Sequence, residues 1–355
     1  MTVERNLETG VTGKPHRNLG HSLYGPLEDV AGNAGHTEHP PRVGFFTDTS
    51  VCIGCKACEV ACKEWNLVPE DGFNLLGMSF DNTGSLGADS WRHVAFVEQD
   101  RAIGGRDAGY AGLPTGPSGS EATADAIGAA LRLTERGGGQ LGTSAVDLGM
   151  PEFSLPGANT GAETRTDFSW LMMSDVCKHC THAGCLDVCP TGALFRTEFG
   201  SVVVQQDICN GCGYCVSGCP YGVIDRREGD GRAQKCTLCY DRLGDGLEPA
   251  CAKACPTESI QFGPLDELRE RARERVETLH ANGVPEARLY GESPDDGVGG
   301  DGAFFLLLDE PEVYGLPPDP VVPTRNLTDM WKHAALAAGA FLAAGVVAFA
   351  RGGRS

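Results

Sequence analysis

Apolar residues in this chain form short runs that predict strands and longer segments that predict helices. Strands are expected at residues 43–47, at 91–97 and at 259–263. Residues 193–204 have the form of a strand, a glycine-containing turn and a second strand. His93, on the second of these strands, is interpreted as structural. The pattern therefore predicts a protein of short strands and turns with helices at defined places.

Three segments have helical patterns of different kinds. Residues 121–136 place several small apolar residues on one face, and we expect this helix to pack on the surface or on a partner. A strongly charged segment carries apolar residues at helical spacing, which predicts an amphipathic helix that covers one side of a core. Its apolar positions are Leu265, Leu268, Ala272, Val276 and Leu279.

The third helical segment, residues 334–350, contains no charged or strongly polar side chain. As a helix it would be about 26 Å long, against about 30 Å for the hydrocarbon core of a bilayer, and Trp331 and Lys332 can extend it. A buried core helix is the alternative, but a terminal helix that is apolar on every face predicts a single membrane span. Arg351 and Arg354 suggest a cytoplasmic tail and an outward-facing protein body, although Asp329 and Lys332 weaken that bias.

Two regions have the composition of loops. Residues 1–41 are polar, and we expect an extended arm whose histidines are surface residues or partner contacts rather than metal ligands (His16, His21, His36 and His39). Residues 100–165 are rich in glycine and contain no cysteine, so they predict an insertion that holds no metal.

The sixteen cysteines form four quartets, each ending in Cys-x3-Cys, and none is left over. The first and third quartets have the Cys-x2-Cys-x2-Cys-x3-Cys spacing that binds iron-sulfur cubanes, and the other two have a longer middle gap. The quartets are Cys52, Cys55, Cys58 and Cys62; Cys177, Cys180, Cys185 and Cys189; Cys209, Cys212, Cys215 and Cys219; and Cys236, Cys239, Cys251 and Cys255.

A short loop can wrap only three corners of a cubane, so the fourth cysteine is expected to bind the cube of another quartet. We expect this fourth cysteine to open a helix, because a proline follows Cys189, Cys219 and Cys255 and suits a first helical turn. Zinc sites use two Cys-x2-Cys pairs per ion and have no role for a third cysteine three residues further on. Disulfides at this spacing would form strained small loops. Both alternatives are therefore disfavoured.

Composition and missing motifs narrow the class of protein further. The formal charge of −19 excludes a general nucleic-acid binder, because phosphate neutralisation requires positive charge. The chain has no Rossmann-type glycine run after a strand and no phosphate loop, so it is not expected to reduce nicotinamide itself. His179 and His182 lie beside cluster ligands in the sequence; hydrogen bonding to sulfur and plain loop packing are both open interpretations.

The order of the quartets resembles the four-cluster iron-sulfur subunits of molybdopterin oxidoreductases. Residues 51–58 with Cys62 and residues 64–66, then residues 235–239 and 249–251, are most similar to the beta subunit of membrane-bound formate dehydrogenase. The resemblance implies an α+β fold of two intertwined ferredoxin-like units plus a C-terminal transmembrane helix. It implies these divisions: an arm, 1–41; a first ferredoxin half, 42–99, completed by 232–263; an insertion, 100–165; a second unit, 166–231; a helix and extension, 264–329; and a transmembrane helix, 330–351.

The family's pairing, carried onto matching positions, implies four [4Fe-4S] clusters as cofactors. Cluster 1 takes Cys52, Cys55, Cys58 and Cys255; cluster 2 takes Cys62, Cys236, Cys239 and Cys251; cluster 3 takes Cys177, Cys180, Cys185 and Cys219; cluster 4 takes Cys189, Cys209, Cys212 and Cys215. The tryptophan that replaces one ligand in the related nitrate reductase subunit is absent. All sixteen cysteines would thus be iron ligands.

The resemblance also implies a function and partners. The chain would be a non-catalytic subunit that passes single electrons from a molybdenum or tungsten pterin alpha subunit, which oxidises formate, to a membrane cytochrome b gamma subunit and quinone. Export of the outward-facing body would depend on a signal carried by the catalytic partner; if that partner lacks a signal, the body would face the cytoplasm instead. The same chain of clusters could instead serve a hydrogenase or a dimethyl sulfoxide, polysulfide or nitrate-type reductase. A zinc-binding scaffold is the non-redox alternative.

Overall fold

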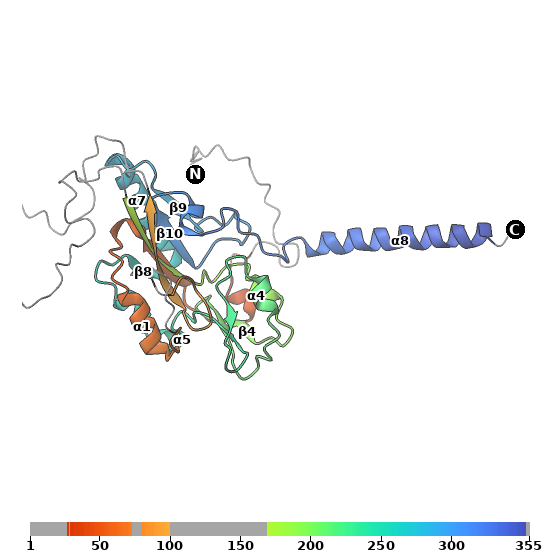
Figure 1. The fold of residues 1–355 in the computed structure, drawn as a ribbon, viewed down its shortest axis with the longest axis horizontal. Helices are drawn as coiled ribbons and strands as arrows, with labels where there is room; N and C mark the ends of the chain where they lie inside the picture. Colours follow the sequence, from red (N-terminus) through yellow and green to blue (C-terminus); the bar gives the residue numbers. More distant parts are fainter. Residues whose placement is uncertain (1–26, 28, 73–79, 82, 100–168, 353–355) are drawn as a thin grey trace, which may run out of the picture.

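The computed structural model describes residues 27, 29–72, 80–81, 83–99 and 169–352. Helices and strands are mixed, as expected for an α+β fold (Figure 1). The main sheet has four strands in the order β8-β1-β10-β9, which are β8 (Ile260–Pro264), β1 (Val43–Asp48), β10 (Ala303–Leu307) and β9 (Arg288–Tyr290). β1 lies antiparallel to β8 and parallel to β10, so segments from both ends of the chain meet in its centre.

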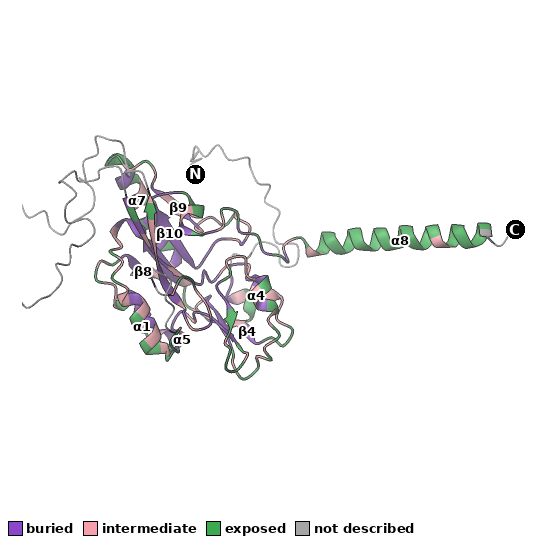
Figure 2. Cartoon of the chain, in the orientation of Figure 1, coloured by how far each residue is buried: buried purple, intermediate pink, exposed green. Residues whose placement is uncertain are grey.

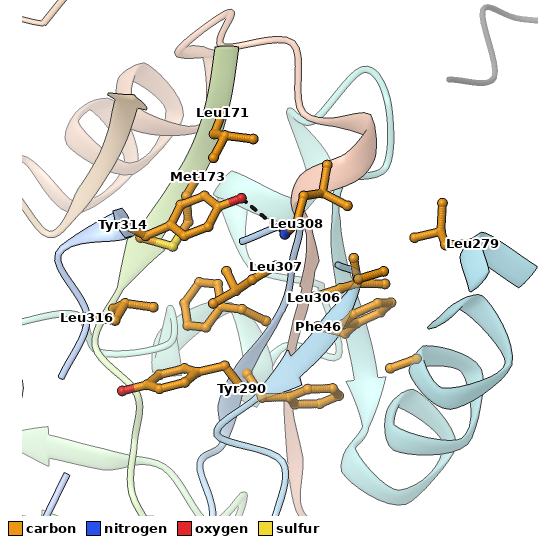
Figure 3. Packing of buried hydrophobic residues seen from close by; sticks show 14 of the residues in the cluster. Phe46, Leu171, Met173, Leu279, Tyr290, Leu306, Leu307, Leu308, Tyr314 and Leu316 are labelled. Carbon is orange, nitrogen blue, oxygen red and sulfur yellow. Dashed lines mark hydrogen bonds between the residues drawn. The ribbon is translucent and has the colours of Figure 1, made fainter. Parts of the chain in front are cut away.

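Helix α7 (Leu265–Ala281) packs against the main sheet, and the largest apolar core includes side chains from α7 and from both faces of the sheet (Figure 3). Four of the five apolar positions predicted from the helical spacing are buried, and Val276 is partly buried against the same core. The 3-10 turn η3 (Pro311–Tyr314) closes the other side, where the Leu308 amide donates to the Tyr314 hydroxyl at 3.1 Å. The amphipathic helix is therefore confirmed.

Strands β2 (Arg92–Gln99) and β3 (Ser169–Val176) pair antiparallel over their whole length. Arg92 is opposite Val176 at one end, and Gln99 is opposite Ser169 at the other. The chain thus leaves β2 into the predicted insertion and returns from it directly into β3. The predicted helix at 121–136 falls outside the described residues.

Two small lobes carry the cysteine quartets (Figure 1). One contains η2 (Thr49–Val51), α1 (Ala57–Asn66), α5 (Tyr240–Gly244) and α6 (Ala250–Lys253). The other contains α3 (Gly184–Asp187), β4 (Leu194–Arg196), β5 (Val202–Val204), α4 (Tyr214–Gly218), β6 (Asp225–Arg226) and β7 (Ala233–Gln234). In the first lobe, Trp65 of α1 donates to Asp241 at 2.8 Å and stacks under the Arg242 guanidinium, which joins the first quartet to the fourth.

Helix α8 (Leu327–Gly352) extends away from the rest of the protein, and almost all its described side chains are exposed (Figures 1 and 2). It begins seven residues before the predicted apolar segment. It is the one helix among the described residues that is long and apolar enough to cross a membrane. A buried core helix is excluded as its explanation, because none of its apolar window is buried in the protein.

The predicted strands at 43–47, 91–97, 193–204 and 259–263 are confirmed, with Gly200 in the hairpin turn at φ 78°. The predicted helix at each fourth cysteine is wrong. Helices α3, α4 and α6 end just before Cys189, Cys219 and Cys255, and α1 contains both Cys58 and Cys62. The following prolines therefore come after a helix, at positions where proline stops the helix from continuing.

Candidate iron-sulfur sites

One cavity lies in the second lobe and is lined by four cysteines from two different quartets. Cys177, Cys180 and Cys185 come from the second quartet, and Cys219 comes from the third. The short helix α4 ends at Gly218, so the chain turns Cys219 away from its own quartet and towards the second. These four cysteines are the set assigned above to cluster 3.

A second cavity lies beside η2 and the start of α1. Cys52, Cys55 and Cys58 of the first quartet line it together with Cys255 of the fourth. Strand β8, which follows Cys255, pairs with β1, which precedes Cys52, so the main sheet brings these distant segments together. The cavity gathers the set assigned to cluster 1.

The remaining eight cysteines influence one another in two further groups. Burial raises the pKa of Cys62 well above its usual value, and Cys236, Cys251 and Cys239 raise it further. Burial likewise raises the pKa of Cys215 to about 11, and Cys209, Cys212 and Cys189 add to the shift. The neighbours of Cys62 and Cys215 are thus those assigned to clusters 2 and 4.

The loop of the first quartet depends on a glycine. Gly54 has φ +64°, and a Cβ there would lie 2.6 Å from the Phe96 ring and 2.7 Å from the Met172 sulfur. Gly222 has nearly the same φ, +63°, but a Cβ there would meet no atom within 4 Å. A comparison of alanine variants at Gly54 and Gly222 therefore separates the cost of the left-handed backbone, about 1–2 kcal/mol, from the cost of the clash.

We expect Gly54→Ala to destabilise the protein by at least about 1 kcal/mol more than Gly222→Ala, because overpacking adds its own cost. The thermal unfolding midpoint should fall by about 2–4 °C more in Gly54→Ala for each such kcal/mol. Cluster 1 should also lose iron more readily in that variant. Equal midpoints for the two variants would show that the contact with Phe96 and Met172 is relaxed at no cost.

The buried thiols are poor ligands until a metal charge is present. Burial raises the pKa of Cys58 to about 12, although Arg92 opposes the shift, and burial raises the pKa of Cys236 to about 12 with help from Cys177. Metal binding requires the thiolate, so iron must displace these protons when a cluster is inserted. Cluster insertion is therefore coupled to proton release and to burial in this fold.

Hydrogen-bond donors surround the sulfur atoms, as in iron-sulfur sites, where such donors help to set the potential. The Ser174 hydroxyl lies 3.2 Å from Cys58 Sγ, and the Leu238 amide lies 3.3 Å from Cys236 Sγ. The Asn66 amide reaches Cys62 Sγ and Cys239 Sγ at 3.8 Å each, and the Ala233 amide reaches Cys209 Sγ at 3.4 Å. These donors fit [4Fe-4S] clusters held by thiolates.

The two histidines of the second quartet have different environments. His179 is buried and lines the cluster 3 cavity; its Nδ1 accepts from the Val202 amide at 3.1 Å. Its Nε2 has no hydrogen-bond partner among the described residues, which favours a role towards the cavity. His182 does not line this cavity and packs against Gly299, which favours loop packing. His93 bonds to Asp81 at 2.8 Å, in agreement with a structural role.

The described histidines of the arm bond to other residues of the protein. His36 bonds to the Arg196 carbonyl at 2.9 Å, and His39 bonds to Asp29 at 3.2 Å. His16 and His21 lie outside the described residues.

The sequence interpretation did not single out two buried cations that reach cysteine sulfurs. Arg92 donates to Cys251 Sγ at 3.3 Å, and Lys235 donates to Cys177 Sγ at 3.6 Å. Lys235 directly precedes Cys236, which is a local signal. Arg92 is 159 residues from Cys251, so nothing in the local sequence connects them.

Comparisons with known proteins agree with this geometry. Residues 168–265 match a family described as a 4Fe-4S dicluster domain. The chain is 34% identical over 312 residues to the iron-sulfur subunit of the nitrate-inducible formate dehydrogenase of Escherichia coli K12, an alignment that covers 86% of this chain and 83% of the relative. It is 33% identical over 300 residues to the formate dehydrogenase iron-sulfur subunit of Haemophilus influenzae, covering 83% and 74% of the two chains.

A more distant relative is the B subunit of the anaerobic dimethyl sulfoxide reductase of Escherichia coli K12, which is 30% identical over 65% of this chain and 77% of its own. All these relatives are subunits of oxidoreductases, and those with the formate dehydrogenase name align over more of the chain. The role of the protein is electron transfer within such a complex. The chain belongs to the family of formate dehydrogenase iron-sulfur subunits.

Proposed function

We propose that this chain carries single electrons through four [4Fe-4S] clusters, numbered 1 to 4 as above, with all sixteen cysteines as iron ligands. The observation that carries the proposal is the cavity in which Cys219 of the third quartet completes the set of Cys177, Cys180 and Cys185. This crossing is the arrangement that two-cluster ferredoxins use. The clusters supply one-electron chemistry, while the chain holds them, excludes water and places donors at their sulfurs.

The electrostatic influence of the cysteines on one another supports one order along the path. Cys251 of cluster 2 raises the pKa of Cys58 in cluster 1, and Cys177 of cluster 3 raises the pKa of Cys236 in cluster 2; in both thiols burial is the larger cause. Cys215 of cluster 4 contributes in the same way to the raised pKa of Cys185, after burial. The order is therefore cluster 1, 2, 3 and 4.

The two ends of this path lie near the surface. Cys55 of cluster 1 and Cys212 of cluster 4 are exposed, whereas Cys236, Cys239 and Cys251 of cluster 2 are buried. Exposed apolar side chains stand beside each end, with Ile53 next to Cys55 and Tyr214 next to Cys212. Electrons thus enter and leave at clusters 1 and 4.

Each lobe forms one ferredoxin-like unit with two clusters. The first unit joins residues 42–99 to 232–263, and the second is residues 166–231. The other segments are the arm (1–41), the insertion (100–165), the extension (264–329) and the transmembrane segment (330–351). The pairing of β1 with β8 and the contact of α1 with α6 support the split first unit.

The partners are a catalytic alpha subunit with a molybdenum or tungsten pterin, which oxidises formate, and a cytochrome b gamma subunit that delivers electrons to quinone. The chain itself is non-catalytic. It is anchored in the membrane by α8, with its body on the outer face and its export dependent on the catalytic partner. The names of the relatives support the formate-oxidising partner, and the exposed apolar surface of α8 supports the anchor.

The experiment is to purify the complex through a tag on this chain under anaerobic conditions and to add formate. We expect the iron-sulfur absorbance to bleach within the turnover time, and quinone to reoxidise the clusters. Dimethyl sulfoxide and hydrogen serve as controls for other catalytic partners. Clusters that dithionite reduces but formate does not would contradict the formate-linked role and leave electron transfer intact.

The second candidate is the same electron path in a dimethyl sulfoxide reductase, favoured by the relative that aligns with 65% of this chain. A zinc scaffold is less favoured. Among the described residues, no three Cys, His, Asp or Glu side chains gather as one ion requires, whereas each thiolate of a cubane binds a separate iron.

A further inference from the structure

Arg92 is a buried cation that lies between the cysteines of clusters 1 and 2. Only 2% of its surface is exposed. Its Nη2 donates to Cys251 Sγ of cluster 2 at 3.3 Å, and its Nη1 donates to the Ser174 hydroxyl at 3.3 Å. That hydroxyl lies 3.2 Å from Cys58 Sγ of cluster 1. A continuous polar path therefore joins the two clusters through Arg92 and Ser174.

Lys235 occupies the equivalent place between clusters 2 and 3. It is 3% exposed; its Nζ donates to Cys177 Sγ of cluster 3 at 3.6 Å and to the carbonyl oxygen of Cys236, a cluster 2 residue, at 2.9 Å. Lys235 also lines the cavity of the cluster 3 cysteines, and it directly precedes Cys236 in the chain. It therefore faces cysteines of both clusters.

Neither cation has a carboxylate partner among the described residues. The contrast is with Lys178, which is equally buried but pairs with Asp175. An unpaired buried charge is strongly destabilising, so Arg92 and Lys235 need another anion. The thiolate-ligated cubanes are anionic and become more so on reduction.

We infer that the charges of Arg92 and Lys235 stabilise the reduced states of the clusters that they separate. They thereby raise the reduction potentials of the clusters along the buried part of the path. This inference rests on the proposed four-cluster function. Because each cation faces two clusters, an electron is stabilised on either side of it. Cluster 2, whose cysteines lie beside both cations, is stabilised in its reduced state by both of them.

The test replaces each cation with methionine in the complex and titrates the four clusters by EPR. We expect Arg92→Met to lower the reduction potentials of two of the four clusters. At a fixed potential, the ratio of oxidised to reduced cluster should change by about tenfold or more for each of the two. A tenfold change corresponds to about 59 mV for one electron. Lys235→Met should also lower two. One potential, that of cluster 2, should fall in both variants, and that of cluster 4 in neither.

Two exposed cations near the clusters are matched controls. Arg226 bonds to the Gly211 carbonyl in the cluster 4 loop at 3.1 Å, and Lys253 lies on α6 between Cys251 and Cys255 with its side chain 72% exposed. Solvent screens both, so Arg226→Met and Lys253→Met should leave all four potentials unchanged. Arg92→Lys and Lys235→Arg should restore most of the native values, because they keep the charge.

The outcomes are distinguishable. Native potentials in both methionine variants, with all clusters present, would overturn this inference but not the proposed function, whereas a native complex without iron clusters would overturn both. If Arg92→Met fails to retain iron while Arg92→Lys retains it, a required charge is supported. Loss of iron from both Arg92 variants would count against the inference, because cluster retention would then depend on the shape of the side chain rather than on its charge.

Discussion

Cys219→Ala should destroy the cluster of the second quartet, although Cys219 belongs to the third quartet in the sequence. Its side chain lines the cavity of Cys177, Cys180 and Cys185. Loss of one thiolate should release that cluster, about four irons, or leave a three-iron remnant. Because cluster 3 is in the middle of the proposed path, electron transfer from formate to quinone should fall by at least about tenfold.

Cys215→Ala is the matched control, since Cys215 is one helical turn earlier in the same quartet. It should remove the cluster of Cys209 and Cys212 instead. Combined variants sharpen the comparison, which is made by iron content and EPR. Cys219→Ala with Cys180→Ala should lose no more clusters than either change alone, whereas Cys219→Ala with Cys212→Ala should lose two. The opposite pattern would show that each quartet holds its own cluster.

A chain that ends at Asn326 should leave the membrane fraction and remain soluble with its clusters intact. The truncation removes α8, whose apolar side chains are exposed and do not pack on the protein body. When the chain is produced without partner subunits, we expect at least about 90% of it to move to the supernatant after ultracentrifugation, since the loss of a spanning helix removes its main apolar contact with lipid.

Single changes in α8 give a milder test. Leu342→Asp places a charge near the centre of the segment, at a cost of about 2.5–3.5 kcal/mol, while Leu342→Ile keeps the segment apolar and is the control. Membrane association should weaken only in the first variant. A truncated chain that remains with the membrane fraction after a carbonate wash would show that another surface of this protein anchors it.

The features that could be predicted from the sequence are those that depend on residues close together in the chain. The cysteine spacing predicted quartets that share ligands, and in the structure each of two cavities is lined by cysteines of two quartets. The strand at residues 43–47 and the amphipathic helix were also predicted, because each satisfies a local hydrophobic period. These elements need no knowledge of distant contacts.

The missed features depend on long-range pairing. Residues 303–308 are entirely apolar, and the first five of them form β10, but only the structure shows that this strand lies beside β1. Strand β3 was missed because its place is fixed by its partner β2 across the insertion. The fourth cysteines were expected to begin helices, yet the short helices end before them, since the chain must turn there to reach another quartet. Arg92 becomes meaningful only beside Cys251.

The central claim is a path of four [4Fe-4S] clusters, and metal analysis with low-temperature EPR tests it most directly. Anaerobically purified complex should contain about sixteen irons and as much acid-labile sulfide in this subunit, as sixteen cysteine ligands imply. Stepwise reduction with dithionite should give several mutually interacting [4Fe-4S] signals. Zinc in place of iron, or no EPR signal on reduction, would contradict the account.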